Sequence, residues 1–384
     1  MGAMSVKTPI YLDYNATTPV APEVLEAMLP YLIEHFGNPS SSHVYGLATR
    51  QAVAEARMSV AALIHAWDGE IVFTGSATEA NNLALLGVAS ASGQTRRHLV
   101  VSAVEHPAVM QPALHLREMG WDLSVVPVDS YGRIDPQAVA AAVRPDTALV
   151  SVMHANNETG TIQPIAEIAR LIKPMGTLFH TDAAQSAGKV ELDVDALGVD
   201  LLTLAGHKFY ATKGVGALYV RAETPIKPIL FGADQEHGLR PGTENVPLVV
   251  GLGAAARLAR ERLPAATQKL RALRDALHER LSAAVSGLVL NGHHEARLPN
   301  TLNLSFPGVT GHALLAAVAS DVAASTGSAC HADSHAASGV LGAMGINAGR
   351  AAGAVRLSVG LYTTEADIER AAHALIEAWR QLRP

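Results

Sequence analysis

Short apolar segments alternate with segments of helical length between residues 70 and 220 of this chain. The apolar segments cover residues 71–73, 98–102, 148–153, 178–181 and 201–204. Continuous apolar runs of this length, separated by helix-sized stretches, are typical of a mostly parallel sheet that helices cover on both faces. The alternation therefore predicts an α/β fold with a large domain built around such a sheet.

The sequence changes character after residue 251. A long connecting helix, two strands and two shorter helices are expected there, over residues 251–285, 302–306, 355–359, 311–319 and 365–381 respectively. The first residues of the chain are expected to pack with these elements and complete a smaller α+β domain. The predicted domains are residues 20–255 for the large one, and residues 1–19 together with 256–384 for the small one.

The composition excludes several classes of protein. Apolar residues make up 49% of the 384 residues and charged residues 17%, which favours a large folded core over disorder. The net charge is −6 and the basic residues are scattered, so no nucleic-acid footprint is predicted. No apolar run is long enough to span a bilayer, and no signal peptide is recognisable. A single cysteine indicates a reducing compartment, so the expected location is the cytoplasm.

Polar residues follow the predicted strands at the edge where open α/β sheets bind their ligands. Lys208 can condense with an aldehyde, Asp182 can hold a protonated pyridine nitrogen, and the N–H groups near Thr78 can bind a phosphate. Each also has an ordinary explanation as a solvated lysine, a helix-capping aspartate or a helix-capping threonine. Pyridoxal 5'-phosphate needs all three groups, so their combination predicts that cofactor, with the His106 ring over its face.

Cys330 lies in a stretch of Gly, Ser and Ala, between residues 323 and 332. Buried cysteines usually have bulky apolar neighbours, so this context favours an accessible, reactive thiol on a loop. An ordinary free cysteine is the alternative explanation. Cys330 and three residues that follow it, His331, Asp333 and His335, also have side chains that could bind zinc, although a second distant pair of ligands is missing.

Ten motifs along the chain resemble those of the cysteine desulfurases, which are class V aminotransferases of fold type I. The similarity is to the nitrogen-fixation and iron–sulfur-assembly branch, and the motifs occur in the order of that family. They are YLDYNATTP at 11–19, FGNPSS at 36–41, ATEANN at 77–82, EHP at 105–107, NNETG at 156–160, DAAQ at 182–185, GHK at 206–208, RPGT at 240–243, GSAC at 327–330 and RLSVG at 356–360. Other details, such as Cys330-His331 followed by Asp333, resemble the selenocysteine lyases.

The resemblance implies a seven-stranded, mostly parallel sheet between helices, and a smaller C-terminal domain that carries the Cys330 loop. It implies a desulfurase that converts L-cysteine to L-alanine, with a persulfide on Cys330 for transfer to an acceptor protein. A selenocysteine lyase acting on L-selenocysteine is the alternative implied by the same motifs. An aminotransferase and an inactive assembly partner remain open as rivals, and the acceptor itself is not predicted.

The resemblance also assigns roles to individual residues. The implied catalytic residues are Lys208, which would carry the cofactor, Cys330 and His106. The implied cofactor-binding residues are Ala77, Thr78, His106, Asn157, Asp182, Gln185, His207, Lys208 and Thr243. Thr243 would reach the cofactor of a neighbouring subunit, which implies a homodimer. The implied substrate-binding residues are Asn15, Asn157 and Arg356, and no metal is implied.

Three positions depart from the pattern of that family. Ala205 replaces a serine whose hydroxyl would bind the phosphate. Ser76 stands where a glycine is more usual, and backbone strain is expected there if the position requires a positive φ. The segment 232–236 replaces a loop richer in glycine, which is expected to narrow the mouth of the site.

Overall fold

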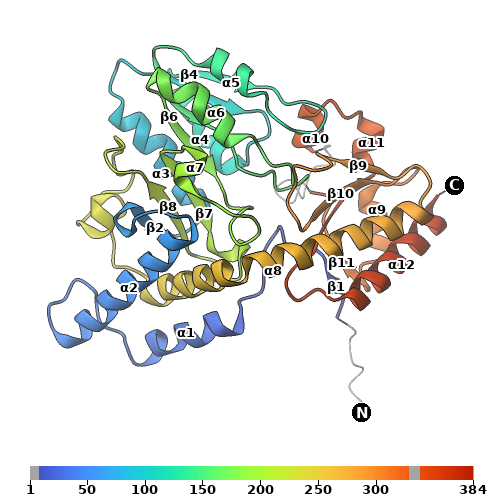
Figure 1. The fold of residues 1–384 in the computed structure, drawn as a ribbon, viewed down its shortest axis with the longest axis horizontal. Coiled ribbons are helices and arrows are strands. Elements are labelled where there is room, and N and C mark those ends of the chain that lie inside the picture. Colours follow the sequence, from blue (N-terminus) through green and yellow to red (C-terminus); the bar gives the residue numbers. More distant parts are fainter. Residues whose placement is uncertain (1–7, 328–337, 384) are drawn as a thin grey trace.

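The computed structural model describes residues 8–327 and 338–383. Its largest sheet has seven strands in the order β2-β8-β7-β6-β5-β3-β4 (Figure 1). Their bounds are β2 Ile71–Thr74, β3 His98–Ser102, β4 Asp122–Val126, β5 Thr147–Ser151, β6 Leu178–Asp182, β7 Leu201–Ala205 and β8 Gly216–Val220. All neighbouring pairs are parallel except those of β8, which runs antiparallel to β2 and β7. The predicted α/β fold with a mostly parallel seven-stranded sheet is confirmed.

Two strands of this sheet do not coincide with any of the apolar segments from which the sheet was predicted. β4 is the edge strand, and its first residues are exposed or half-buried, so it lacks a continuous apolar run. β8 begins with Gly216, where a Cβ would lie 2.8 Å from the carbonyl oxygen of Leu204. β4 therefore depends on the neighbour it pairs with, whereas β8 is itself an apolar run, over residues 217–220, that the prediction did not include.

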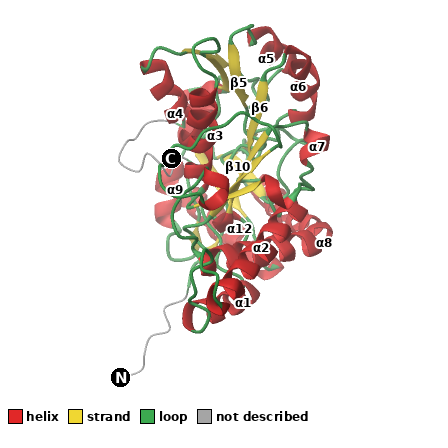
Figure 2. Ribbon diagram, turned by 90° about the vertical axis from the view of Figure 1, so that its left-hand side faces the viewer, coloured by secondary structure: helices red, strands yellow, loops and turns green. Residues whose placement is uncertain are grey.

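Helices cover both faces of the sheet (Figure 2). α3 (Ala77–Ala91) and α4 (Pro107–Glu118) pack on one face, with strand residues such as Val72, Leu99 and Val101. Alternate strand residues such as Phe73 and Val100 point to the other face. That face is covered by α1 Pro22–Ile33, α2 Val44–Leu63, α5 Pro136–Ala142, α6 Ile165–Ile172, α7 Val194–Leu197 and the first half of α8 Val246–Ala284. Burial on both faces explains why the central strands are rich in apolar residues.

A second core lies beside this layer structure. Its sheet has the order β12-β10-β9 and is antiparallel, and β1 pairs with β11 in parallel. Its elements are β1 Ile10–Tyr11, β9 Val289–Asn291, β10 Thr301–Ser305, β11 Val322–Ala323, β12 Ala354–Ser358, α9 Gly311–Ala317 and α12 Glu365–Leu382. Ile10 and Leu12 belong to this core together with residues of the second half of α8. The helices α10 Gly339–Ala343 and α11 Ala348–Ala352 bury their apolar residues in a separate small cluster, which includes Val104 and Met153 of the large domain. The exact domain boundaries stay a prediction.

α8 runs along both cores (Figure 1). Leu252 in its first half is buried against the large sheet, and Leu277 in its second half is buried in the small core. The helix begins at Val246, earlier than the predicted start at residue 251. Asn245 caps it by accepting a hydrogen bond from Leu248 N, and Pro247 lies in the first turn, where its missing N–H costs nothing. Because of this cap, α8 begins before the Ala- and Leu-rich segment from which its start was predicted.

Candidate active site

A cavity of about 200 Å³ lies where the carboxyl ends of β5, β6 and β7 meet the start of α3. Its lining includes every predicted cofactor-binding residue except Thr243. The lining residues are Ser76, Ala77, Thr78, Asn81, His106, Ala108, Met153, Ala155, Asn157, Asp182, Ala184, Gln185, Ala205, His207 and Lys208. Parallel strands bring their carboxyl ends to one edge, and the polar residues that follow them therefore converge there.

The start of α3 forms one end of the cavity. Ser76 caps the helix by accepting a hydrogen bond from Glu79 N at 3.1 Å. Its φ is −174°, which is extended backbone, so the strain considered for a serine at this position is absent. The N–H groups of Ala77 and Thr78 lie in the first helical turn, where no intrahelical acceptor exists. Such a turn binds anions such as phosphate, and the neighbouring Ala205 contributes no hydroxyl to it.

Asp182 lies at the other end of the cavity and is only 6% exposed. Its Oδ1 accepts a hydrogen bond from Ala184 N at 2.9 Å, and its Oδ2 accepts one from Asn81 Nδ2 at 2.7 Å. Asn81 is fully buried in α3, and its own Oδ1 has no hydrogen-bond donor among the described residues. Asn81 belongs to the ATEANN motif but was not among the predicted site residues. An asparagine amid the Ala and Leu of this helix was the signal that could have revealed it.

The His106 ring also lines the cavity, at the N-cap of α4. Its Nδ1 accepts a hydrogen bond from Ala108 N at 3.1 Å, so Nδ1 carries no hydrogen and the neutral ring carries it on Nε2. Burial lowers the pKa of His106, Asp182 acts in the opposite direction, and Lys208 lowers it further. The ring is therefore a fixed, uncharged plane at neutral pH.

Lys208 follows β7 in the short helix η3 (Gly206–Lys208). Its Nζ donates hydrogen bonds to the carbonyl oxygens of Asn15 at 2.6 Å and Ala16 at 2.8 Å. His207 contacts Thr17 Oγ1 through Nδ1 at 3.2 Å. Burial lowers the pKa of His207 to about 4, and nearby lysines contribute, so the ring is neutral. The N-terminal segment thus holds both residues, although it is remote from them in the sequence.

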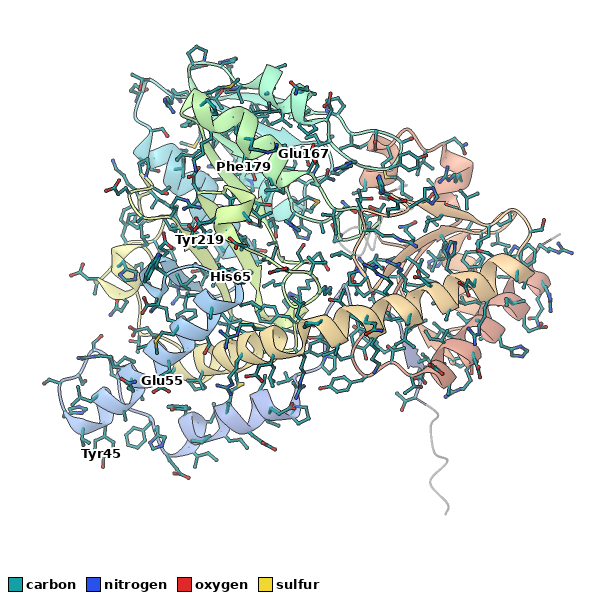
Figure 3. All side chains as sticks on the ribbon, in the orientation of Figure 1. Tyr45, Glu55, His65, Glu167, Phe179 and Tyr219 are labelled. Carbon is teal, nitrogen blue, oxygen red and sulfur yellow. The ribbon has the colours of Figure 1, made fainter. Side chains whose placement is uncertain are left out.

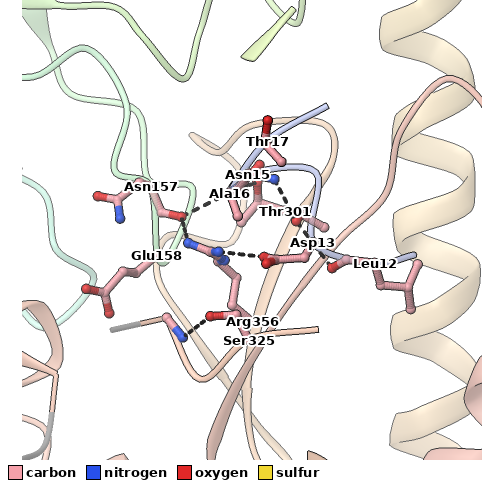
Figure 4. A network of polar contacts seen from close by, with 12 residues as sticks. Leu12, Asp13, Asn15, Ala16, Thr17, Asn157, Glu158, Thr301, Ser325 and Arg356 are labelled. Carbon is pink, nitrogen blue, oxygen red and sulfur yellow. Dashed lines mark hydrogen bonds and ion pairs between the residues drawn. The ribbon is translucent and has the colours of Figure 1, made fainter. Parts of the chain in front are cut away.

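The three predicted substrate-binding residues meet beside this cavity (Figure 4). Arg356, on β12, is 2% exposed. It donates from Nη2 to Asp13 Oδ1 at 2.6 Å and from Nη1 to the carbonyl oxygen of Asn157 at 3.2 Å. That same oxygen accepts from Asn15 Nδ2 at 3.2 Å. The ion pair with Asp13 was not predicted, although Asp13 belongs to a motif that the sequence analysis quoted.

One predicted cofactor-binding residue does not line the cavity, and one predicted catalytic residue lies outside the described residues. Thr243 lies in the exposed loop before α8 and does not line it. Cys330 falls outside the described residues, as do the other members of the candidate zinc set, His331, Asp333 and His335. Within residues 8–327 and 338–383, no group of three or more His, Cys, Asp and Glu side chains could hold a metal ion.

The donors around the cavity fit pyridoxal 5'-phosphate. N–H groups at the start of α3 suit its phosphate, the Asp182 carboxylate suits its ring nitrogen, and the Lys208 amine suits its aldehyde. Gly216 allows its strand to approach the start of α3 closely, because a Cβ at this position would lie 2.9 Å from Ala77 N. Any larger residue at that position would displace the backbone of Ser76 and Ala77, which would hold a phosphate.

Comparison with known proteins identifies the family. The model of the class-V aminotransferases matches residues 10–371. The chain belongs to this family. It is 44% identical to the cysteine desulfurase IscS of Dictyoglomus turgidum, over 99% of this chain and 97% of that protein. A solved structure described as a NifS-like protein superimposes with a TM-score of 0.91 at 36% identity, covering 98% of this chain and 99% of the other.

A second similar solved structure contains a ligand. It is described as SspA in complex with cysteine, and it superimposes with a TM-score of 0.82 at 36% identity, covering 92% of this chain and 99% of that one.

In the part of the chain that the structure describes, no helix has the length and apolar character needed to cross a membrane.

Proposed function

We propose that this class-V family member is a pyridoxal-phosphate-dependent cysteine desulfurase. It would convert L-cysteine to L-alanine and leave a persulfide on Cys330 for an acceptor protein. The observation that carries the proposal is one cavity lined by Lys208, Asp182 and the start of α3, with Arg356 close by. The names of the curated relatives, cysteine desulfurase IscS among them, support cysteine as the substrate.

The substrate carboxylate would bind to Arg356, whose planar guanidinium suits a carboxylate. The Nε atom of Arg356 is buried and has no acceptor among the described residues, so the side chain has spare donor capacity. Asp13 would keep the guanidinium in place through its ion pair. The Asn15 amide, fixed by Thr301 Oγ1 at 2.9 Å, would border the substrate on the same side.

The cofactor, when bound, would supply an electron sink for the negative charge that develops at the substrate Cα. Lys208 Nζ would take the Cα proton and later return a proton to the product skeleton. Asp182, oriented by Asn81, would hold the proton on the ring nitrogen, and the neutral His106 ring would lie against the ring face. Gln185 and Asn157 would contact the ring hydroxyl, and His207 the phosphate.

Cys330 would accept the sulfur from the substrate. Its thiolate would attack the substrate sulfur, forming a sulfur–sulfur bond while the carbon–sulfur bond breaks. The electron pair of the broken bond stays with the carbon skeleton, which takes up a proton and leaves as alanine. Cysteine and the enzyme thiol are thus converted to alanine and an enzyme persulfide, with no external oxidant or reductant.

A homodimer is part of this proposal. Phe36 and Phe231 are 75% and 90% exposed. Tyr45, in the first turn of α2, is 57% exposed (Figure 3). The segments that carry them come together, because Pro39 and Asp234 line the same groove. Exposed aromatic residues of this density are typical of protein interfaces. A second copy packed here would cover them and bring the exposed Thr243 toward the partner's cavity.

The deciding experiment gives L-cysteine and L-selenocysteine separately to the purified holoenzyme and measures alanine. Intact-mass analysis then looks for one extra sulfur on the wild type and on Cys330→Ser. We expect alanine from L-cysteine and an added sulfur that the variant lacks. Alanine from L-selenocysteine alone would make the protein a selenocysteine lyase, and a keto acid in place of alanine would make it an aminotransferase. Either result would overturn the proposal.

A further inference from the structure

Lys189 is a buried lysine that the proposed reaction does not use. It lies in the turn after β6 and is only 6% exposed. No carboxylate pairs with it within the described residues; its Nζ donates to the carbonyl oxygen of Gln185 at 2.9 Å and to Gln185 Oε1 at 3.4 Å. A lysine can usually extend its amine to water, so a buried ammonium without a counter-ion is costly. Such an arrangement calls for a role.

A short chain of hydrogen bonds joins Lys189 to Lys208. Gln185 contacts Lys189 through its amide oxygen and donates from Nε2 to the carbonyl oxygen of Asn15 at 3.0 Å. The same carbonyl oxygen accepts a hydrogen bond from Lys208 Nζ at 2.6 Å. An ammonium only donates and a carbonyl only accepts, so the two contacts together fix which end of the Gln185 amide points each way.

The surroundings of Lys189 are positive. The charged and titratable groups that face it are Lys208 and His207 after β7 and Arg356 on β12. From α8, the Thr267 hydroxyl donates to the carbonyl oxygen of Lys189 at 2.9 Å. Burial, together with the smaller effects of the Lys208 and Arg356 charges, lowers the pKa of Lys189 to about 7. The charges of Lys189 and Lys208 therefore repel each other, and each disfavours protonation of the other.

We propose that Lys189 is a positioning residue that fixes the Gln185 amide and, through its charge, favours the neutral amine of Lys208. The inference rests on the proposed function, in which that amine must be unprotonated to bind the cofactor and to accept the Cα proton. Because Lys189 contacts the amide oxygen of Gln185, the Nε2 atom of Gln185 stays at the cavity wall. Lys189 acts through Gln185 and Asn15 and touches neither substrate nor cofactor.

The test measures the protonation of Lys208 directly. The full chain, freed of cofactor, is labelled with acetic anhydride over a range of pH, and the acetylation of Lys208 is read by mass spectrometry. We expect Lys189→Met to raise the midpoint of the Lys208 labelling curve by about one pH unit, because a like charge is removed. Lys227→Met, an exposed lysine elsewhere, should leave the midpoint unchanged. An unchanged or lowered midpoint in Lys189→Met would overturn the electrostatic role.

A second variant separates charge from positioning. Lys189→Gln keeps an N–H donor for Gln185 but removes the charge, and it remains available if Lys189→Met fails to fold. It should raise the Lys208 midpoint as Lys189→Met does, yet bind pyridoxal phosphate more tightly than Lys189→Met in a fluorescence titration. Equal cofactor affinities would overturn the positioning role. These readouts need no turnover, so a failed cysteine assay of the wild type would refute the proposed function separately.

Discussion

At the scale of single residues, one buried amide sets the orientation of the Asp182 carboxylate. Asn81 donates to Asp182 Oδ2 at 2.7 Å and has no exposure to solvent. A hydrogen bond to a charged acceptor contributes about 1.5–3 kcal/mol, more than one between neutral groups. Asn82, its neighbour, is instead in a surface contact and donates to the carbonyl oxygen of Thr78. The two adjacent asparagines therefore give a matched pair for experiment.

Asn81→Ala is expected to weaken both the fold and the cofactor site. The lost hydrogen bond to a carboxylate should lower the free energy of unfolding by about 2 kcal/mol, and pyridoxal phosphate should bind more weakly. Urea denaturation and a cofactor titration measure the two effects. Asn82→Ala is the control and should change neither by more than about 0.5 kcal/mol. Equal effects of the two substitutions would contradict the role given to Asn81.

Arg356→Lys tests the substrate end of the cavity. A lysine keeps the charge but loses the planar pair of donors, so a substrate carboxylate should lose about 2 kcal/mol of binding, a roughly thirtyfold rise in KM. Steady-state kinetics with L-cysteine measure this change. Arg370→Lys, on the surface of α12, is the control. A KM that stays at the wild-type value would show that Arg356 does not bind the substrate.

Glu105, next to His106, predicts a pH effect on stability. Burial raises its pKa to about 8 from the ordinary 4.5, although hydrogen bonds from Ser102 and Met153 N oppose the rise. Between these values the folded state holds a proton that the unfolded state has released, so the contribution of Glu105 to stability falls as pH rises. Glu105→Gln does not titrate and should escape this loss.

The measurement compares urea denaturation of Glu105→Gln and the wild type at pH 5 and pH 8. The free energy of unfolding of the variant, relative to the wild type, should increase with pH by roughly 1 kcal/mol per unit. Glu118→Gln, an exposed change on the same helix α4, should show no such trend. A constant difference at both pH values would mean that Glu105 is ionised in the folded protein.

At the scale of elements, the turn η4 (Gln235–Gly238) is held by a buried ion pair. Glu236 has a left-handed φ of 49°, and its carboxylate contacts both terminal nitrogens of Arg57 at 2.6 and 2.8 Å. It also accepts a hydrogen bond from Phe73 N at 2.7 Å. These contacts offset the unfavourable backbone conformation of a residue other than glycine. The turn thereby docks on β2, just before the start of α3.

Glu236→Gln should release this turn. Removing one member of a buried ion pair leaves Arg57 without its counter-charge and costs about 3 kcal/mol. Chemical denaturation measures the loss, and Glu34→Gln, an exposed residue after α1, serves as the control. A loss below about 1 kcal/mol would mean that the pair behaves like an exposed surface ion pair.

At the scale of the whole molecule, the proposed homodimer makes the exposed aromatic surface testable. Changing Tyr45 and Phe231 together to Asp would place two charges in the expected interface, where they would be desolvated without partners. We expect a monomer in sedimentation analysis and weaker cofactor binding, because Thr243 of a second copy would be missing. Met175→Asp, an exposed residue after α6, is the control and should leave the mass unchanged. A variant with the wild-type mass would place the interface elsewhere.

The sequence by itself determined most strands of the large sheet and the polar residues at their ends. β3, β5 and β7 are buried on both faces, so mostly apolar local runs were enough to find them. Parallel strands place their carboxyl ends together, so Asp182 and Lys208 could be expected at one cavity from their positions in the sequence alone. The edge strand β4 and the capped start of α8 were not predicted, because neither has a strong apolar pattern of its own.

Only the tertiary structure decided which distant residues support the site. Lys208 meets the carbonyl oxygen of Asn15, 193 positions away, and Arg356 meets Asp13, 343 positions away. Asn81 reaches Asp182 across 101 positions. Hydrophobic periodicity reports which face of an element is buried, but not which polar group from another element will meet it there. Those partners are set by the packing of two cores around α8, which no local pattern encodes.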